Sequence, residues 1–171
     1  WANSGLVVEI HPEDVLSTPT NDPLALMNWI ERLEGESWTQ ARCSLRAPAQ
    51  RMTDFLSGRS SVDLPKSSYN MGLTPSRLDE WLPSFITKRI QKAFQLFDRQ
   101  TKGFLTAEAQ LIALESRTSS PVRILRESTS CEHPLLRGLF PCGEGAGYAG
   151  GIVSAAMDGE RCAEGVASYL G

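Results

Sequence analysis

The chain has 171 residues, of which 41% are hydrophobic and 22% are charged, with a formal net charge of −3 at pH 7. This length is sufficient for one domain with a hydrophobic core or for two smaller lobes. The charge balance excludes the polycationic composition of a nucleic-acid-binding protein, and no apolar run reaches the roughly 20 residues of a membrane-spanning helix, so neither nucleic acid nor a membrane is an expected partner.

The chain is predicted to open with one strand and one helix. Residues 5–10 are rich in β-branched side chains and predict a strand, which His11-Pro12 ends because proline cannot continue a ladder. Pro23 precedes apolar residues at three- and four-residue spacing and predicts a helix that ends at Gly35.

Three further helices are predicted before Gly103. One spans residues 48–56, and a polar connection without periodicity follows it. Thr74-Pro75 predicts the start of a short helix that ends at Leu82, and Pro83 begins a longer one. The predicted buried face of the longer helix consists of Ile86, Ile90, Ala93, Phe94 and Phe97.

The pattern changes after Gly103. Strands are predicted at residues 110–117, 122–126 and 138–142, followed by a glycine loop at 143–151 and a helix at 152–170. We expect one stripe of mostly small residues to form the inner face of that helix: Ile152, Ala155, Ala156, Gly159, Ala163, Val166 and Leu170. The predicted fold class is α+β, with a mainly helical lobe over residues 1–115 and a strand–glycine-loop–helix within residues 116–171.

Glycine and cysteine are distributed unevenly. Nine of the 14 glycines lie between Gly138 and Gly171. The four cysteines are too scattered for a disulfide scaffold, and no leader sequence is visible, which favours a reducing, cytoplasmic location. Because the chain begins with Trp1 and almost at once enters a predicted strand, we expect a piece of a longer polypeptide whose functional chemistry lies near its C-terminal end.

The glycine loop contains Gly145-x-Gly147-x-x-Gly150 between a predicted strand and a predicted helix. Glycine lets the backbone approach a ligand and adopt positive φ, and a helix N-terminus offers N–H groups to an anion. The second strand and the acidic residue of a complete dinucleotide-binding unit do not follow. We therefore interpret the loop as part of a last strand, loop and helix added to a sheet whose earlier strands lie elsewhere.

Three segments carry a family resemblance. Residues 118–124 (TSSPVRI) and 138–159 (GLFPCGEGAGYAGGIVSAAMDG) resemble the C-terminal end of bacterial FAD-dependent dehydrogenase-like proteins, often labelled NAD(FAD)-utilising dehydrogenases. Residues 46–56 (RAPAQRMTDFL) are similar to another segment of that family. The resemblance implies a flavoprotein oxidoreductase with FAD as cofactor and NAD(P)H as a candidate electron partner. Its N-terminal Rossmann half would bind the ADP part of FAD and would be this chain's partner.

The resemblance also implies cofactor-binding residues. Gly143, Glu144 and Gly145 would face the ribitol and phosphate region of FAD. The flavin pyrimidine edge would lie beside Tyr148, Gly150, Gly151 and Ile152, and Gly147 belongs to the same set. Glu144 occupies the place where related flavoproteins often have an aspartate that binds a ribitol hydroxyl. The alternative for Glu144 is an exposed loop carboxylate without a ligand.

Substrate, catalytic and metal residues are less clearly indicated. Arg123, with Ser119 and Ser120, is a candidate for binding an anionic substrate or the flavin, and a structural salt bridge is the alternative. Arg46 and Arg51 are candidates for a substrate site between lobes, against a role on a helix surface or in capping. No catalytic residue or proton donor is identified.

Cysteine and histidine do not predict a metal site. Cys131-x-His133 with Cys142 has poor spacing and no evident fourth ligand, so no metal is expected. Cys142 is a candidate redox partner of a flavin, and the alternative is a small buried residue that ends a strand.

The sequence therefore predicts the C-terminal fragment of an FAD-dependent oxidoreductase with an unidentified small-molecule substrate. We expect the fragment alone to be inactive and to bind FAD weakly or not at all. The alternative is a non-enzymatic nucleotide- or partner-binding module, because a family fold does not by itself establish chemistry.

Overall fold

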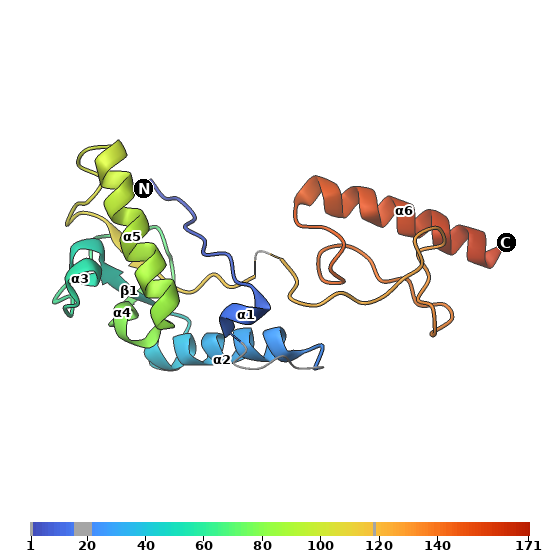
Figure 1. The fold of residues 1–171 in the computed structure, drawn as a ribbon, viewed down its shortest axis with the longest axis horizontal. Coiled ribbons are helices and arrows are strands. Elements are labelled where there is room, and N and C mark those ends of the chain that lie inside the picture. The colour runs from blue at the N-terminus through green and yellow to red at the C-terminus, as the bar shows by residue number, and fades with distance from the viewer. Residues whose placement is uncertain (1, 16–21, 118) are drawn as a thin grey trace. The chain divides into compact units, whose positions relative to one another are not determined.

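The structure, a computed structural model, describes residues 2–15, 22–117 and 119–171. It has helices and one small sheet, which confirms the α+β fold class (Figure 1). The chain divides into two compact units, each described by itself below. Unit 1 comprises Trp1–Asp14 and Ile30–Leu114, and unit 2 comprises Val15–Trp29 and Glu115–Gly171. That residues 1–115 and 116–171 belong to different domains of a longer protein stays a prediction.

The described residues form six helices and three strands. The helices are α1 (Pro12–Val15), α2 (Ala25–Gln40), α3 (Met52–Ser57), α4 (Leu78–Trp81), α5 (Ser84–Gln100) and α6 (Ile152–Leu170). The strands are β1 (Ala47–Arg51), β2 (Leu73–Pro75) and β3 (Gln110–Ile112).

The sheet of unit 1 has the order β2-β1-β3, with β1 parallel to β2 and antiparallel to β3. Its central strand is buried from Ala47 to Gln50. Gln50 is fully buried and its polar atoms are paired: Nε2 donates to the carbonyl of Arg59 at 2.9 Å and to Oδ1 of Asp79 at 2.6 Å. This pairing joins β1 to α4 and offsets the cost of burying an amide.

The hydrophobic core of unit 1 lies among α3, α4 and α5. Phe55 and Leu78 are fully buried, and the rings of Phe55 and Phe94 meet edge-on with centroids 6.3 Å apart. Ile86, Ile90 and Phe94 on α5 are buried, so this part of the predicted apolar face is confirmed. Periodicity identified the face because α5 is long enough to show several turns.

The predicted starts of two helices in unit 1 are wrong, because Pro48 and Thr74 lie in strands of the sheet instead. Residues 47–51 form β1, and the predicted helix begins only at Met52. Pro48 has no N–H to donate, but its carbonyl accepts the N–H of Ala113 at 3.0 Å. Thr74 lies opposite Pro48 in β2, so the short helix starts at Leu78 rather than at Thr74.

The predicted stop at Gly35 is also wrong, because α2 continues to Gln40. The actual end uses non-glycine residues: Arg42 and Cys43 have φ of 59° and 51°, and the N–H of Cys43 donates to the carbonyl of Trp38 at 2.9 Å. Residues 5–10 form no strand, although they were predicted to do so. No described strand pairs with them, and β-branched composition alone does not make a ladder.

The regular structure of unit 2 after residue 118 is α6, whose bounds agree with the predicted helix. The predicted strands at 122–126 and 138–142 are wrong, since both segments are irregular, and only Gln110–Ile112 of the predicted strand at 110–117 forms. The inner face of α6 differs partly from the predicted stripe. Its buried or half-buried residues are Ala155, Asp158, Gly159, Cys162, Gly165 and Val166, whereas Ile152, Ala156, Ala163 and Leu170 are exposed.

Two glycines of α6 give a matched test of this packing. A Cβ added at Gly165 would lie 2.3 Å from the carbonyl oxygen of Ser130, whereas a Cβ at Gly159 meets nothing within 4 Å. We expect Gly159→Ala to stabilise α6 by about 0.5–1 kcal/mol, because alanine replaces glycine in an open helical position. Gly165→Ala should destabilise by about 1–3 kcal/mol through overpacking. Urea unfolding followed by circular dichroism measures both, and equal effects of the two substitutions would contradict this packing.

Candidate functional site

The glycine loop of unit 2, residues 143–151, is a compact turn before α6. The N–H of Gly147 donates to the carbonyl of Glu144 at 2.9 Å, and the N–H of Tyr148 donates to the carbonyl of Gly143 at 3.0 Å. Gly143 and Gly147 have φ of 73° and 85°, which favours glycine at both positions. Gly147 also lies so close to Val122 that an added Cβ would be 2.6 Å from its carbonyl oxygen.

Residues 120–124 support the loop from one side. Oγ of Ser120 donates to the carbonyl of Val122 at 2.8 Å and lies 3.3 Å from that of Gly145. Nε of Arg123 donates to the carbonyl of Gly147 at 3.0 Å. The N–H of Ile124 donates to the carbonyl of Ala146 at 3.1 Å. The resemblance segment at 118–124 and the glycine loop are therefore brought together, with residue 118 outside the described residues.

A buried ion pair holds the base of the loop to α6. Arg126 and Asp158 form two hydrogen bonds, at 2.5 and 3.0 Å, with side chains only 5% and 10% exposed. Asp158 also accepts the N–H of Gly143 at 2.8 Å, and Arg126 donates to the carbonyl of Pro141 at 2.7 Å. The guanidinium of Arg126 lies 3.7 Å from the ring centroid of Tyr148. These contacts fix the segment on which the loop begins.

The same contacts shift the pKa values of this site. The hydrogen bonds from Arg126 lower the pKa of Asp158 to about 2, against the opposing effect of burial and with help from the N–H of Gly143. The pKa of Arg126 is raised, chiefly by its hydrogen bonds to Asp158. Burial raises the pKa of Cys162 to about 12, and its contact with Cys142 adds to the shift. Asp158 is therefore an anion throughout the neutral range.

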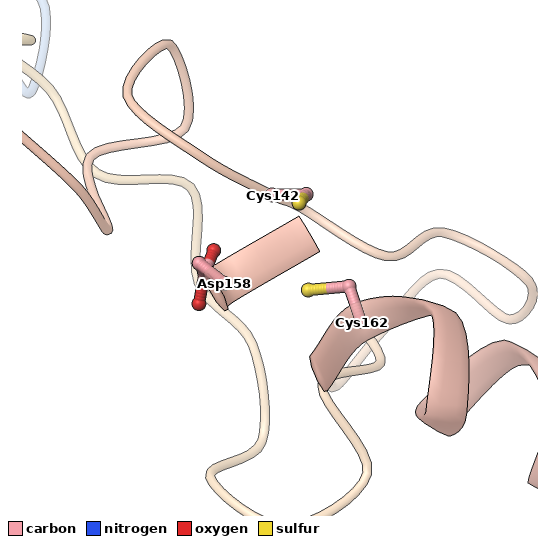
Figure 2. Close-up of side chains that lie close together, drawn as sticks. All are labelled: Cys142, Asp158 and Cys162. Atoms are coloured by element: carbon pink, nitrogen blue, oxygen red, sulfur yellow. The ribbon is translucent and has the colours of Figure 1, made fainter. Parts of the chain in front are cut away.

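Two cysteines lie near Asp158, the acidic partner of the ion pair (Figure 2). The sulfurs of Cys142 and Cys162 and a carboxylate oxygen of Asp158 all lie within 4.8 Å of one another. This set does not fit a divalent cation, because Asp158 already binds Arg126 and the guanidinium lies 3.0 Å from the sulfur of Cys162. The sequence-based set with His133 is not formed. Nδ1 of His133 instead accepts two backbone N–H groups at 3.1 Å.

The other residues that the sequence assigned to binding FAD or substrate at the loop differ in their exposure. Glu144, Gly145 and Gly150 are exposed, and Gly151 is the N-cap of α6, where its N–H donates to Oγ of Ser154 at 3.1 Å. Ile152 is 93% exposed. Tyr148 is half-buried, and its hydroxyl donates to the carbonyl of Ile124 at 3.0 Å. Ser119 is exposed beside Gly150.

The predicted arginines of unit 1 make local contacts. Nε of Arg46 donates to Oγ1 of Thr74 at 3.2 Å, and its Nη2 donates to the carbonyl of Leu73. Arg51 pairs with Asp63 at 2.7 Å and donates to the carbonyl of Ala107. These contacts support β1 and its connections, and the substrate role assigned to both arginines stays a prediction.

Sequence reasoning did not single out Arg126 or Asp158. Arg126 ends a predicted strand, and Asp158 lies between Met157 and Gly159 on a helix. Asp158 could have been recognised as a carboxylate within a stripe of small residues, because a charged side chain on the buried face of a helix requires a partner of opposite charge. In the part of the chain that the structure describes, no helix is sufficiently long and apolar to cross a membrane.

Comparisons with known proteins agree with the resemblance. Residues 1–118 match the family model described as "FAD-dependent protein, C-terminal domain-like", which defines a domain associated with flavoproteins. The chain belongs to this family. An "Uncharacterized protein" of Clostridium beijerinckii (strain ATCC 51743 / NCIMB 8052) is 38% identical over 165 residues, which is 95% of this chain. The chain spans 30% of the length of that relative.

The two matches cover different lengths of the chain. The family model ends at residue 118, before the glycine loop. The similarity to the Clostridium beijerinckii protein covers 95% of the chain and therefore continues into the loop and α6.

Proposed function

We propose that the glycine loop and the first turn of α6 form part of an FAD site in a flavin-dependent oxidoreductase. Membership of the family of FAD-dependent proteins supports the cofactor, and the open glycine backbone directly before α6 supports its assignment to this loop. In this proposal, Gly143, Glu144 and Gly145 meet the ribitol and phosphate region. The flavin edge meets Tyr148, Gly150, Gly151 and Ile152. When bound, FAD supplies hydride or electron transfer through its ring, with a small molecule as substrate.

The shape of the loop fits a cofactor at close range. A Cβ added at Gly143 or Gly145 would meet nothing within 4 Å, so the backbone is open on that side. The loop leads directly into α6, whose first N–H groups and positive dipole end favour an anion such as a phosphate. The fit therefore rests on an open glycine backbone next to a helix N-terminus.

The charge around the loop supports the same ligand. Arg126 is neutralised by Asp158, whereas Arg123 donates to the carbonyl of Gly147 and lies 5.1 Å from the ring centroid of Tyr148. Among the described residues, no carboxylate forms an ion pair with Arg123. Its guanidinium can therefore add positive charge beside the loop, which would favour a pyrophosphate.

The partner in this proposal is the N-terminal Rossmann half of a longer protein. Ile152, Val153 and Met157 of α6 are 93%, 71% and 66% exposed. Three large apolar side chains on two adjacent turns are typical of a surface that another part of a protein covers. Such a half would bind the ADP part of FAD and place the flavin against the loop.

Flavin content after purification tests this function. The 171 residues alone should bind FAD weakly or not at all, because in this proposal the Rossmann half supplies the part of the site that binds the ADP of FAD. The same chain expressed with the natural sequence that flanks it should retain about one FAD per protein after desalting, measured by visible absorbance. A longer protein that folds but carries no flavin and binds none on titration would contradict the proposal and favour a non-enzymatic binding module.

A further inference from the structure

We propose that Cys142 and Cys162 form a reversible disulfide, which makes the base of the glycine loop a site of thiol oxidation. The inference does not depend on the proposed FAD site. It rests on two thiols of unit 2 that the sequence separates by 20 positions and the structure places together.

The two sulfurs are neighbours that are not bonded to each other. Both cysteines are free, and their sulfurs lie within 4.8 Å of each other. Figure 2 shows the side chain of Cys162 projecting from α6 toward the segment that carries Cys142. A disulfide needs a sulfur–sulfur distance of about 2 Å, so the sulfurs must approach. Rotation of the exposed Cys142 side chain can supply this movement while the hydrogen bonds at Pro141 and Gly143 hold the backbone on either side.

The two thiols differ in accessibility, which assigns their roles. Cys142 is exposed and can meet a small-molecule oxidant, whereas Cys162 is only 4% exposed. Burial excludes reagents in solution from Cys162 and raises its pKa to about 12, so this thiol reacts only with a disulfide sulfur that forms beside it. Cys142 is therefore the attacking thiol, and Cys162 resolves the product.

The reaction with a low-molecular-weight disulfide balances as two exchanges. The thiolate of Cys142 attacks one sulfur of the reagent, a mixed disulfide forms, and one reagent thiolate leaves. The sulfur of Cys162 then attacks the sulfur of Cys142, and its proton passes to the second leaving thiolate. The two cysteines lose two electrons and two protons in total, and the reagent disulfide is reduced to two thiols.

Arg126 favours the second exchange. Its Nη1 lies 3.0 Å from the sulfur of Cys162, so a positive charge is present where thiolate character develops. Cys162 lies on α6 next to Cys142, and the ion pair between Asp158 of α6 and Arg126 holds the helix in place. The second exchange is therefore intramolecular and needs only the approach of Cys142.

Oxidised glutathione is the probe that tests the pair. The native chain is incubated with it, remaining thiols are alkylated, and the products are identified by intact mass and peptide mapping. We expect a Cys142–Cys162 disulfide and little glutathione adduct, and dithiothreitol should restore both thiols. A native chain that keeps glutathione on Cys142, leaves both thiols unmodified, or links Cys142 to Cys131 would overturn the proposal.

Variants separate the two roles. Cys162→Ser should trap the glutathione adduct on Cys142, at a level at least about tenfold above that of the native chain, because no resolving thiol remains. Cys142→Ser should leave Cys162 unmodified. Cys131→Ser and Cys43→Ser are matched controls that should keep the disulfide. Peptide mapping of the native chain decides the question even where a variant fails to fold, and none of these readouts involves FAD.

Discussion

Asp158→Ala should unfold α6 from the rest of unit 2. The substitution leaves the guanidinium of Arg126, whose side chain is 5% exposed, without its carboxylate, and it also removes the acceptor of the Gly143 N–H. Removing one partner of a buried ion pair costs about 3–5 kcal/mol. Unit 2 has few buried side chains after residue 118, so a loss of this size exceeds what its core can supply. Hydrogen exchange of the α6 amides and far-UV circular dichroism measure the effect.

Two controls distinguish the buried pair from charge loss in general. Glu80→Ala removes a carboxylate that is 64% exposed and pairs with Arg77, and it should cost about 0–1 kcal/mol. Replacing both partners, as Arg126→Met with Asp158→Leu, should be less damaging than Asp158→Ala, because no buried charge is left unpaired. Equal losses for Asp158→Ala and Glu80→Ala would show that the pair does not hold the loop.

The pH dependence of unit 2 follows from the same carboxylate. Its pKa is lowered from 3.8 to about 2 in the folded state, so the stability that it contributes is fully present above about pH 4. That contribution is lost as the pH falls toward 2. Acid titration of native α6 should show this loss, and Asp158→Asn should remove this carboxylate's part of it.

Gly147→Ala should displace the glycine loop and weaken FAD binding in the longer protein. The new Cβ would lie 2.6 Å from the carbonyl oxygen of Val122, and the backbone has φ of 85°. A residue held in this conformation costs about 1–3 kcal/mol before any contact is counted. A loss of about 1.4 kcal/mol corresponds to tenfold weaker binding, and we expect at least that change in the FAD titration.

Gly145→Ala is the matched control for Gly147→Ala. A Cβ at Gly145 meets no atom within 4 Å, and its φ is not in the left-handed region. The fold of unit 2 should therefore be unchanged by this substitution. If Gly147→Ala left unfolding at the level of the Gly145→Ala variant and FAD affinity at the level of the native protein, the loop geometry described above would be wrong.

The sequence predicted α5 and α6 well because both carry several turns of periodic information. Pro83 and Gly151 lie immediately before α5 and α6, where terminus signals and periodicity agree. Short elements failed for the opposite reason. Residues 47–51 have the composition of a helix start, and only their pairing with Leu73–Pro75 and Gln110–Ile112 makes them a strand.

Only the glycine loop of the candidate site could be predicted from the sequence. The glycine loop follows from its spacing, and positive φ at Gly143 and Gly147 agrees with the physical reason given for glycine there. The pairing of Arg126 with Asp158 joins an irregular segment to a helix across 32 positions, and no periodicity reports such a contact. The strand predicted at 122–126 failed because this segment contacts the glycine loop through separate hydrogen bonds from the Arg123 side chain and the Ile124 N–H rather than through a ladder with a strand.

Hydrogen exchange of the longer protein, with and without FAD, tests whether the cofactor lies on the glycine loop. We expect slower exchange at residues 143–152 when FAD is added, because the cofactor would cover the loop and the first turn of α6. The Gly147→Ala variant should lose this protection, and the Gly145→Ala variant should retain the native fold of the loop. Tight FAD binding that leaves exchange at residues 143–152 unchanged would contradict the assignment of the cofactor site to this loop.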